Sequence, residues 1–385
     1  MAIGGGRISQ LDGLRGLAAM IVVFSHIATG FVPALYFGSE QLAVPQWQAS
    51  FATSPLFVAI NGSFAVYIFF VLSGFVIAGS ADTSKASIPT NCIARVVRLS
   101  VPCSMSVLLA AALLGLRITW ISEAAKIVNH KWIRDYIGDY PLRVVLAEAS
   151  GGYYLTGGSH LNPVLWTMQR DLIGSLAIYI IFGVFRERMP RLVACAVAVL
   201  ALAVSKVEAH YYLCFVAGSA LFLMRDQVSR LPSWAGILAL CVGLVLGGRP
   251  FAVPTFGSFY YIPYTVLGKL YLYVWPLGAA FIVTGTLLSA TAASVLGSPA
   301  GRFFGRISFG VYLIHFALLK SLMSYLFVSY GRFGPVEFAI SSLVYICTVI
   351  AAGFVFTILV VEPATRLSFM VKRRAVSRRT ERAIN

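Results

Sequence analysis

The sequence predicts an all-α polytopic membrane protein with about ten transmembrane helices in one bundle. Of its 385 residues, 59% are hydrophobic and 11% are charged, whereas charged residues make up about 25% of a soluble domain. The hydrophobic residues form runs close to the ~20 residues needed to cross a bilayer. Lys and Arg gather between these runs. The predicted spans are 14–35, 57–79, 101–117, 164–184, 192–204, 211–225, 234–248, 268–289, 307–328 and 338–361.

The distribution of Lys and Arg predicts that both termini are cytoplasmic, because cytoplasmic loops carry an excess of these residues. With the N-terminus inside, the inside loops contain Lys85, Arg95, Arg98, Arg186, Arg188, Arg191, Arg225, Arg230, Arg302 and Arg306. Four of the five outside connections contain only Lys206, Arg249, Lys269 and Arg332. The fifth, 117–163, is also positively charged, but a long loop has little weight in this rule.

We expect a single membrane domain over residues 1–385, embedded in membrane lipids. In it, 117–163 is an extracytoplasmic or interfacial loop and 364–385 is a basic cytoplasmic tail. The first half of 117–163 has the pattern of an amphipathic helix at the interface, and glycines in its second half predict a loop. Because long ordered loops often cover binding sites, a substrate-facing role is one interpretation of this segment.

The net charge and the cysteines point away from a nucleic-acid partner and from a metal site. The formal charge of +16 is explained by the membrane topology, so we expect no nucleic-acid partner. The six cysteines are scattered, without a CxxC motif or a histidine at metal-ligand spacing, which predicts buried thiols and no metal site. No small-residue cleavage site follows the first hydrophobic run, which we therefore interpret as a retained span.

The first span contains three ionisable residues, Asp12, Arg15 and His26. A charge inside lipid costs at least ~2.5–3.5 kcal/mol, so such residues indicate partners or a polar cavity. Arg15 and His26 are eleven residues apart, which is ~16 Å along a helix and places them on one face. One alternative remains open, in which Asp12 and Arg15 flank the membrane and His26 bonds to a neighbouring helix.

Two arginines follow the second span. Arg95 and Arg98 are three residues apart and therefore lie on one helix face, where two guanidinium groups suit a phosphate. Taken alone, such a pair next to the membrane is more often a feature of lipid-headgroup binding or of topology. Ser73 and Gly74, at the inner end of the second span, are expected near these arginines, and a glycine there permits close backbone approach.

The fourth span buries Arg170 next to Asp171. Counting the rise per residue from the outer face places Asp171 at the same depth as His26. An acid at that depth would hold the histidine tautomer and stabilise its protonated form. The alternative is that Asp171 pairs with Arg170 or that both are structural.

Polar residues also lie in the last two spans. His315 and Lys320 are unusual in a hydrophobic span. Glu362 lies at the inner edge, at the depth of Arg15, Arg302 and Arg306, and is expected to pair with one of these arginines.

Taken together, these segments resemble the membrane acyltransferase 3 family of integral-membrane sugar O-acyltransferases. The motifs follow the family's order along nearly the whole chain. They are LDGLRGLAAMIVVFSH (11–26), FFVLSGFVI (69–77), RVVRLSVP (95–102), LWTMQRD (165–171), ISFGVYLIHF (307–316) and VEP (361–363).

The resemblance implies transfer of an acyl group, usually acetyl, from acyl-CoA to a hydroxyl of a carbohydrate or glycolipid such as polysaccharide or lipopolysaccharide. It implies a multi-pass protein of the plasma membrane, which is the inner membrane in bacteria. The family's Arg and His of the first span correspond to Arg15 and His26, and its basic pair to Arg95 and Arg98. The family usually has Glu followed by aromatic residues where this chain has Asp171. Without a fused esterase-like domain, the chain resembles the stand-alone members.

These observations predict an acyl-CoA-dependent O-acyltransferase. Arg95, Arg98 and Arg15 would hold the phosphates of acyl-CoA, and His26 would act as general base. A role of His26 as a transient acyl carrier is less favoured. Asp171 is a second catalytic candidate, and the substrate-binding candidates are Asp12, Arg15, Ser73, Arg95, Arg98, Trp166, His315 and Glu362. The alternative is a transporter or flippase, because buried Arg, Asp and His also describe proton-coupled carriers.

Overall fold

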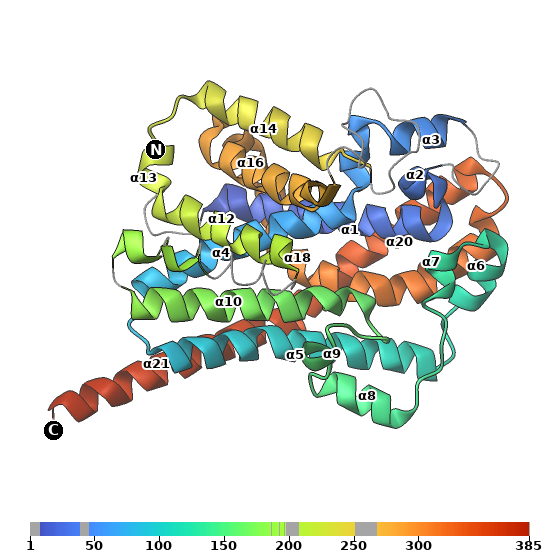
Figure 1. Cartoon of the computed structure of the whole chain (residues 1–385). Helices are drawn as coiled ribbons and strands as arrows, with labels where there is room; N and C mark the ends of the chain where they lie inside the picture. Colours follow the sequence, from blue (N-terminus) through green and yellow to red (C-terminus); the bar gives the residue numbers. More distant parts are fainter. Residues whose placement is uncertain are drawn as a thin grey trace.

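The computed structural model describes residues 8–38, 46–185, 187–191, 193–195, 197, 208–250 and 268–384. This part of the chain is a bundle of long helices without strands, and short helices cover one end (Figure 1). The expected all-α polytopic membrane fold is therefore confirmed.

Seven helical stretches of the described chain are long and apolar enough to cross a membrane. Two shorter apolar helices, α12 (Ala209–Leu223) and α14 (Ser233–Gly247), complete nine of the ten predicted spans. The predicted span 192–204 lies largely outside the described residues. The seven stretches are α1 (Ser9–Phe31), α4 (Gly62–Thr83), α5 (Ile88–Gly115), η2 with α10 (Pro163–Val184), η3 with α16 (Leu270–Leu288), α18 to η5 (Pro299–Gly331) and α20 to α21 (Pro335–Ser377).

Shorter helices connect these spans. Before α4 lie α2 (Ala34–Phe37), α3 (Gln46–Ala52) and η1 (Pro55–Ile60). The predicted long connection contains α6 (Ile121–Val128), α7 (Lys131–Arg134), α8 (Leu142–Ala149) and α9 (Tyr153–Thr156). Two more, α13 (Arg225–Val228) and α17 (Ala290–Leu296), follow α12 and α16.

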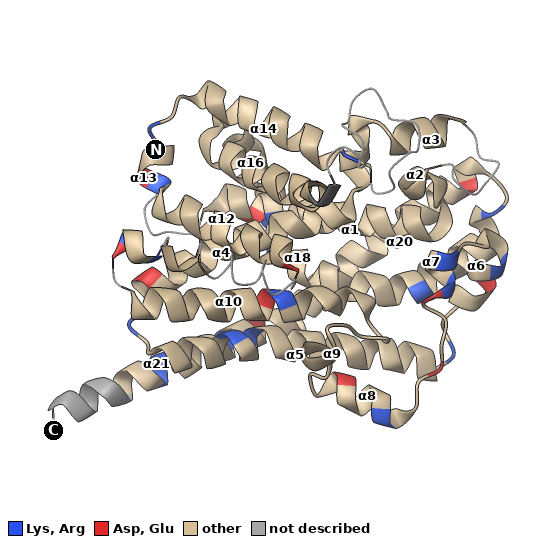
Figure 2. Ribbon diagram, in the orientation of Figure 1, with Lys and Arg blue, Asp and Glu red and all other residues tan. Residues whose placement is uncertain are grey.

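Both chain ends lie at the same end of the bundle, α6 and α7 lie at the other end, and α8 lies beside the distal half of α5 (Figure 1). This arrangement agrees with an even number of crossings. Figure 2 shows that charged side chains are sparse along much of the bundle and more frequent near its two ends, as a membrane-embedded middle requires. The cytoplasmic assignment of the end that carries the termini, which we call the terminal end, rests on the excess of Lys and Arg.

Glycines set the contact between α1 and α18 (Pro299–Leu318). A Cβ on Gly16 would lie 2.6 Å from the backbone carbon of Phe304, and one on Gly305 would collide with the carbonyl of Asp12. Small residues at a helix crossing let the backbones approach closely. Ten residues beyond this crossing on each helix, His26 and His315 are in contact, so the two helices run parallel and in register.

The connection 117–163 folds over the end of the bundle opposite to the termini. The amide of Trp120 donates to the carbonyl of Lys320 at 2.9 Å, and the α6 helix that follows buries one apolar face, as its amphipathic pattern predicted. The second half, predicted as loop, includes the single-turn helix α9 and is tied together by Glu148. Hydrogen bonds from Ser159 and His160 outweigh the effect of burial and lower the pKa of the Glu148 carboxyl.

The predicted tail is not separated from the last span. The helix α20 (Pro335–Phe356) continues through the π-helical turn η6 (Thr357–Val361) into α21 (Glu362–Ile384), which projects from the bundle (Figure 1). A proline inside a helix removes one backbone hydrogen bond. The π turn directly before Pro363 rearranges these bonds locally, so the helix does not end where the VEP motif suggested.

Candidate functional site

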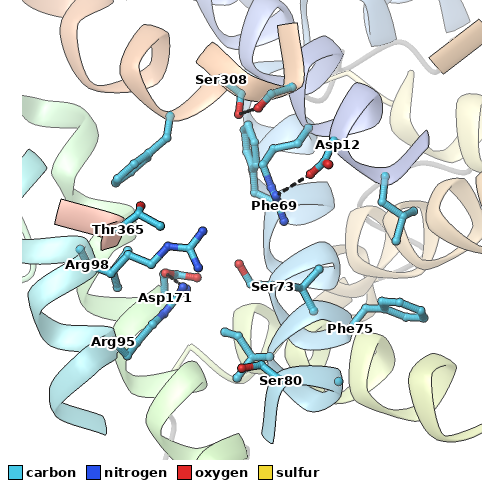
Figure 3. Close-up of a pocket in the computed structure, with 18 of the residues that line it drawn as sticks. Asp12, Phe69, Ser73, Phe75, Ser80, Arg95, Arg98, Asp171, Ser308 and Thr365 are labelled. Carbon is cyan, nitrogen blue, oxygen red and sulfur yellow. Dashed lines mark hydrogen bonds and ion pairs between the residues drawn. The ribbon is translucent and has the colours of Figure 1, made fainter. Parts of the chain in front are cut away.

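A cavity of about 910 Å³ opens toward the terminal end of the bundle. Its walls come from α1, α4, α5, α10, α18 and α21, so segments far apart in the sequence contribute to it. Seven of the sequence-predicted site residues line it, namely Asp12, Arg15, Ser73, Arg95, Arg98, Asp171 and Glu362. Figure 3 shows several of these side chains facing one another across the cavity.

The cavity carries a net positive charge. Its described lining includes six arginines and four carboxylates, an excess of two positive charges. Three of the carboxylates form ion pairs with lining arginines: Asp12 with Arg15 at 3.5 Å, Asp171 with Arg95 at 2.6 Å and Glu362 with Arg306 at 2.7 Å. A polyanionic ligand is therefore favoured in this cavity.

Arg95 and Arg98 have different environments although they are one helix turn apart. Arg95 is held by Asp171 and also donates from Nε to the hydroxyl of Ser175 at 3.0 Å. Arg98 reaches into the cavity beside Asp171 (Figure 3), and within the described ranges no carboxylate lies within 4.0 Å of its guanidinium. Arg98 thus keeps its donors available for a ligand, while Arg95 is largely used by the protein.

A histidine pair lies deeper in the bundle, between α1 and α18. Nδ1 of His26 is 2.8 Å from Nε2 of His315, and Nδ1 of His315 is 2.7 Å from the carbonyl oxygen of Tyr312. The hydroxyl of Tyr345 donates to the carbonyl of His315 at 2.8 Å and fixes its backbone. His315 is completely buried, whereas His26 is partly exposed.

The carbonyl of Tyr312 determines the tautomers of the pair. A carbonyl oxygen only accepts hydrogen bonds, so Nδ1 of His315 is the protonated nitrogen and its Nε2 accepts when the ring is neutral. Nδ1 of His26 must then be the donor between the rings. The lone pair of His26 consequently lies on Nε2, for which the described residues provide no hydrogen-bond partner.

Aromatic rings pack around His26. The Trp132 ring stacks on it at 5.7 Å between centroids, and Phe316 meets it edge-on at 5.3 Å. Tyr136 packs on both Trp132 and Phe316, at 4.9 and 4.8 Å. The connection 117–163 therefore supplies part of the wall beside this histidine.

A layer of side chains separates the cavity from the histidines. Neither histidine lines the cavity, whose deep end includes Phe69, Thr167 and Tyr312. The hydroxyl of Tyr312 bonds to Thr167 and to the carbonyl of Val164. The ring of Tyr312 is 5.9 Å from that of His315, so the two regions are one aromatic ring apart.

The structure corrects the expected pairing of Asp171 with His26. Asp171 pairs with Arg95 in the cavity, and its neighbour Arg170 pairs with Glu208. The depth count failed because the fourth span begins inside the bundle. Asn162, which precedes it, is 1% exposed, and its side-chain Nδ2 donates to the carbonyl of Leu313 at 2.8 Å. Asp171 is therefore farther from the outer face than the count assumed.

Two other candidates have different surroundings from those expected. Trp166 is not part of the described cavity lining; it packs on Tyr211 and beneath the guanidinium of Arg170 at 4.9 Å. His315 lies against His26 and not in the cavity. The expected pairing of Glu362 with an inner-edge arginine is confirmed, because it binds Arg306.

Sequence reasoning missed Ser175, Tyr312 and Trp132. Ser175 is four residues after Asp171 and therefore on the same helix face, a spacing that was available in the sequence. Tyr312 lies one turn before His315 in the quoted motif. Trp132 belongs to the segment 117–163, for which a substrate-facing role was one interpretation, but nothing in the sequence placed it beside His26.

Comparison with known proteins adds to this geometry. Residues 8–362 match the acyltransferase domain of the acyltransferase 3 family. The chain belongs to this family. Acyltransferase R4 of Phoma sp. is 23% identical in an alignment over 457 residues, which covers 93% of this chain and 94% of that protein. No solved structure shows a significant match.

Membership of this family makes the protein an acyltransferase of the membrane. It favours an enzyme over the transporter or flippase that the buried charges also suggested. The resemblance seen in the motifs is thereby confirmed.

Proposed function

We propose that this acyltransferase transfers an acyl group, acetyl in the first instance, from acyl-CoA to a hydroxyl of a carbohydrate or glycolipid at the plasma membrane, the bacterial inner membrane. The observation that carries the proposal is the His26–His315 pair, anchored at a backbone carbonyl one ring away from an arginine-lined cavity.

The cavity supports the binding of acyl-CoA. Its excess of positive charge suits the phosphates of the nucleotide. Arg98, whose donors are not taken by a described carboxylate, would bind a phosphate directly, and Arg15 would lie farther along the same path. The eleven residues from Arg15 to His26 correspond to ~16 Å, a distance that the extended arm of the cofactor would bridge.

The tautomer of the histidine pair supports His26 as the general base. With its Nδ1 hydrogen held by His315, His26 would accept the proton of the acceptor hydroxyl at Nε2. His315 would position this ring from Nε2, a role for which the sequence suggested Asp171. Asp171 is instead proposed to hold Arg95 in the donor cavity.

The proposed reaction has one covalent exchange. The acceptor hydroxyl loses its proton to His26 while its oxygen forms a bond to the carbonyl carbon of the thioester. The carbon–sulfur bond then breaks, and the departing thiolate takes the proton from His26, which restores the neutral pair and releases CoA as a thiol. Tyr312 lies between donor and base, so its ring would have to turn aside for the thioester to reach His26.

The test uses the purified full-length protein in proteoliposomes. Acetyl-CoA is the donor, and the acceptors are cell-envelope glycans from the organism in which the protein naturally occurs. His26→Gln should lower acetyl transfer by about 10²–10⁴-fold, because it removes the base. His315→Gln should lower it by a smaller factor. His210→Gln, a change in α12 outside the pair, is the matched control and should retain activity.

Thiol release from acetyl-CoA and acetyl incorporation into glycan are measured together. Full activity of the His26 variant would contradict the proposed base. If the unchanged protein released no thiol in the presence of envelope glycans, acyl-CoA would not be its acyl donor.

A further inference from the structure

Lys320 is a buried cation that the proposed reaction does not use. It lies in the π-helical turn η4 (Leu319–Met323), five residues after His315, and is 6% exposed. In the described parts of the chain, its ammonium group has no hydrogen-bond partner and no carboxylate within 4.0 Å. Its Nζ lies over the face of Tyr140, 6.0 Å from the ring centre.

Neighbouring groups hold Lys320 in place without neutralising it. Its carbonyl accepts the amide of Trp120. Glu148, which influences it electrostatically, is already bound by the hydroxyl of Ser159 and the amides of His160 and Leu161. A lysine that is mostly buried and has no close anion is costly, and π turns of this kind often occur at functional sites.

Lys320 lies beside the same aromatic wall as the histidine pair. Phe316, four residues before it, contacts both His26 and Tyr136. Tyr140, four residues after Tyr136, faces Lys320 itself. Five residues separate Lys320 from His315, about 7.5 Å along the helix axis, and the direction is away from the donor cavity. One saccharide ring spans a separation of this order.

We propose that Lys320 determines acceptor specificity by binding an anionic group, a carboxylate or a phosphate, of an acidic saccharide whose neighbouring hydroxyl reaches His26. The rings of Trp132, Tyr136 and Tyr140 form the wall along which the sugar packs. An ammonium ion and an anion form a charge-assisted hydrogen bond in this sheltered site. The position of the hydroxyl rests on the proposed function, whereas binding of the anion does not require acyl transfer.

The test measures equilibrium binding to the full-length protein in nanodiscs, without acyl-CoA. The probes are methyl β-glucuronide, methyl β-glucoside and glucose 6-phosphate, titrated by calorimetry. We expect at least one anionic sugar to bind ten times more tightly than the neutral glycoside. Whichever of the two anionic sugars binds more tightly shows whether the site prefers a carboxylate or a phosphate. Equal affinity of all three probes for the unchanged protein would overturn the proposal.

Variants assign the effect to Lys320. K320Q should abolish the preference for the anionic sugar, K320R should retain most of it, and K131Q, which removes an exposed lysine of the same end, should leave it unchanged. A preference that survives in folded K320Q would refute the role of Lys320, and the comparison of probes on the unchanged protein decides the question if K320Q does not fold. If the unchanged protein showed no acyl transfer but kept a Lys320-dependent preference for the anionic sugar, the proposed function would be wrong and the anion site would stand.

Discussion

At the scale of single residues, the sequence identified the ionisable side chains but not their partners. Seven of the ten candidates meet in one cavity, because charges in hydrophobic spans have few places to lie. Partner choice depends on helix depth, and Asp171 shows the limit: a span that begins inside the bundle shifts every residue that follows. Lys320 was seen as unusual, but its aromatic neighbours come from a connection whose path the sequence does not reveal.

The contrast between Arg95 and Arg98 gives a prediction at this scale. Arg95→Gln leaves the carboxylate of Asp171 buried without its cation, which should destabilise the protein by about 3–5 kcal/mol. Arg98→Gln should leave stability nearly unchanged and raise the KM for acyl-CoA, because Arg98 is proposed to bind phosphate. Thermal unfolding in detergent and steady-state kinetics separate the two effects.

The double variant R95Q/D171N is the control, because it removes both charges and should recover much of the lost stability. If R98Q lowered stability as much as R95Q while KM stayed constant, Arg98 would be a structural residue and the donor site would have to lie elsewhere.

At the scale of helices, the register between α1 and α18 positions the proposed base. Gly16 and Gly305 meet at the crossing, and ten residues farther along both helices the two histidines meet. The sequence contained the glycines and the histidines, and it predicted both spans. It could not reveal that these helices are neighbours, because their pairing is a contact between segments almost three hundred residues apart.

A larger residue at the crossing of α1 and α18 should therefore disturb the histidine pair ten residues away. Gly305→Leu places a side chain against the backbone of Asp12, and we expect a loss of stability of about 1–3 kcal/mol together with a larger loss of acyl transfer, since the two helices separate. Gly115→Leu, at the end of α5 where a Cβ meets no atom within 4 Å, is the matched control. An active Gly305→Leu protein with an unchanged melting temperature would show that the crossing does not set the spacing of the histidines.

At the scale of the whole molecule, the two chemical regions face opposite ends of the bundle. The arginine cavity opens at the terminal end, and the aromatic wall with Lys320 belongs to the end covered by 117–163 (Figure 1). Composition and loop charges predicted the membrane fold and placed both termini on one side, which the structure bears out. The sequence also predicted that the arginines for the donor and His26 lie at different depths. It did not predict the layer that separates them, because this layer depends on Tyr312 and Thr167 meeting between the spans.

This division predicts that the acyl group passes from a donor on one face of the membrane to an acceptor on the other. Acyl-CoA is charged and does not cross lipid, so it should be consumed only from the face that carries the C-terminal helix α21, while the acylated sugar should appear at the opposite face. Sealed proteoliposomes test this, with the orientation of the protein measured by protease cleavage of α21 and acetyl-CoA supplied either outside or in the lumen. Thiol release should follow the fraction of molecules whose α21 faces the donor. Consumption from both faces at equal rates, or product on the donor face, would be incompatible with two regions separated by Tyr312 and would place donor and acceptor in a single cavity.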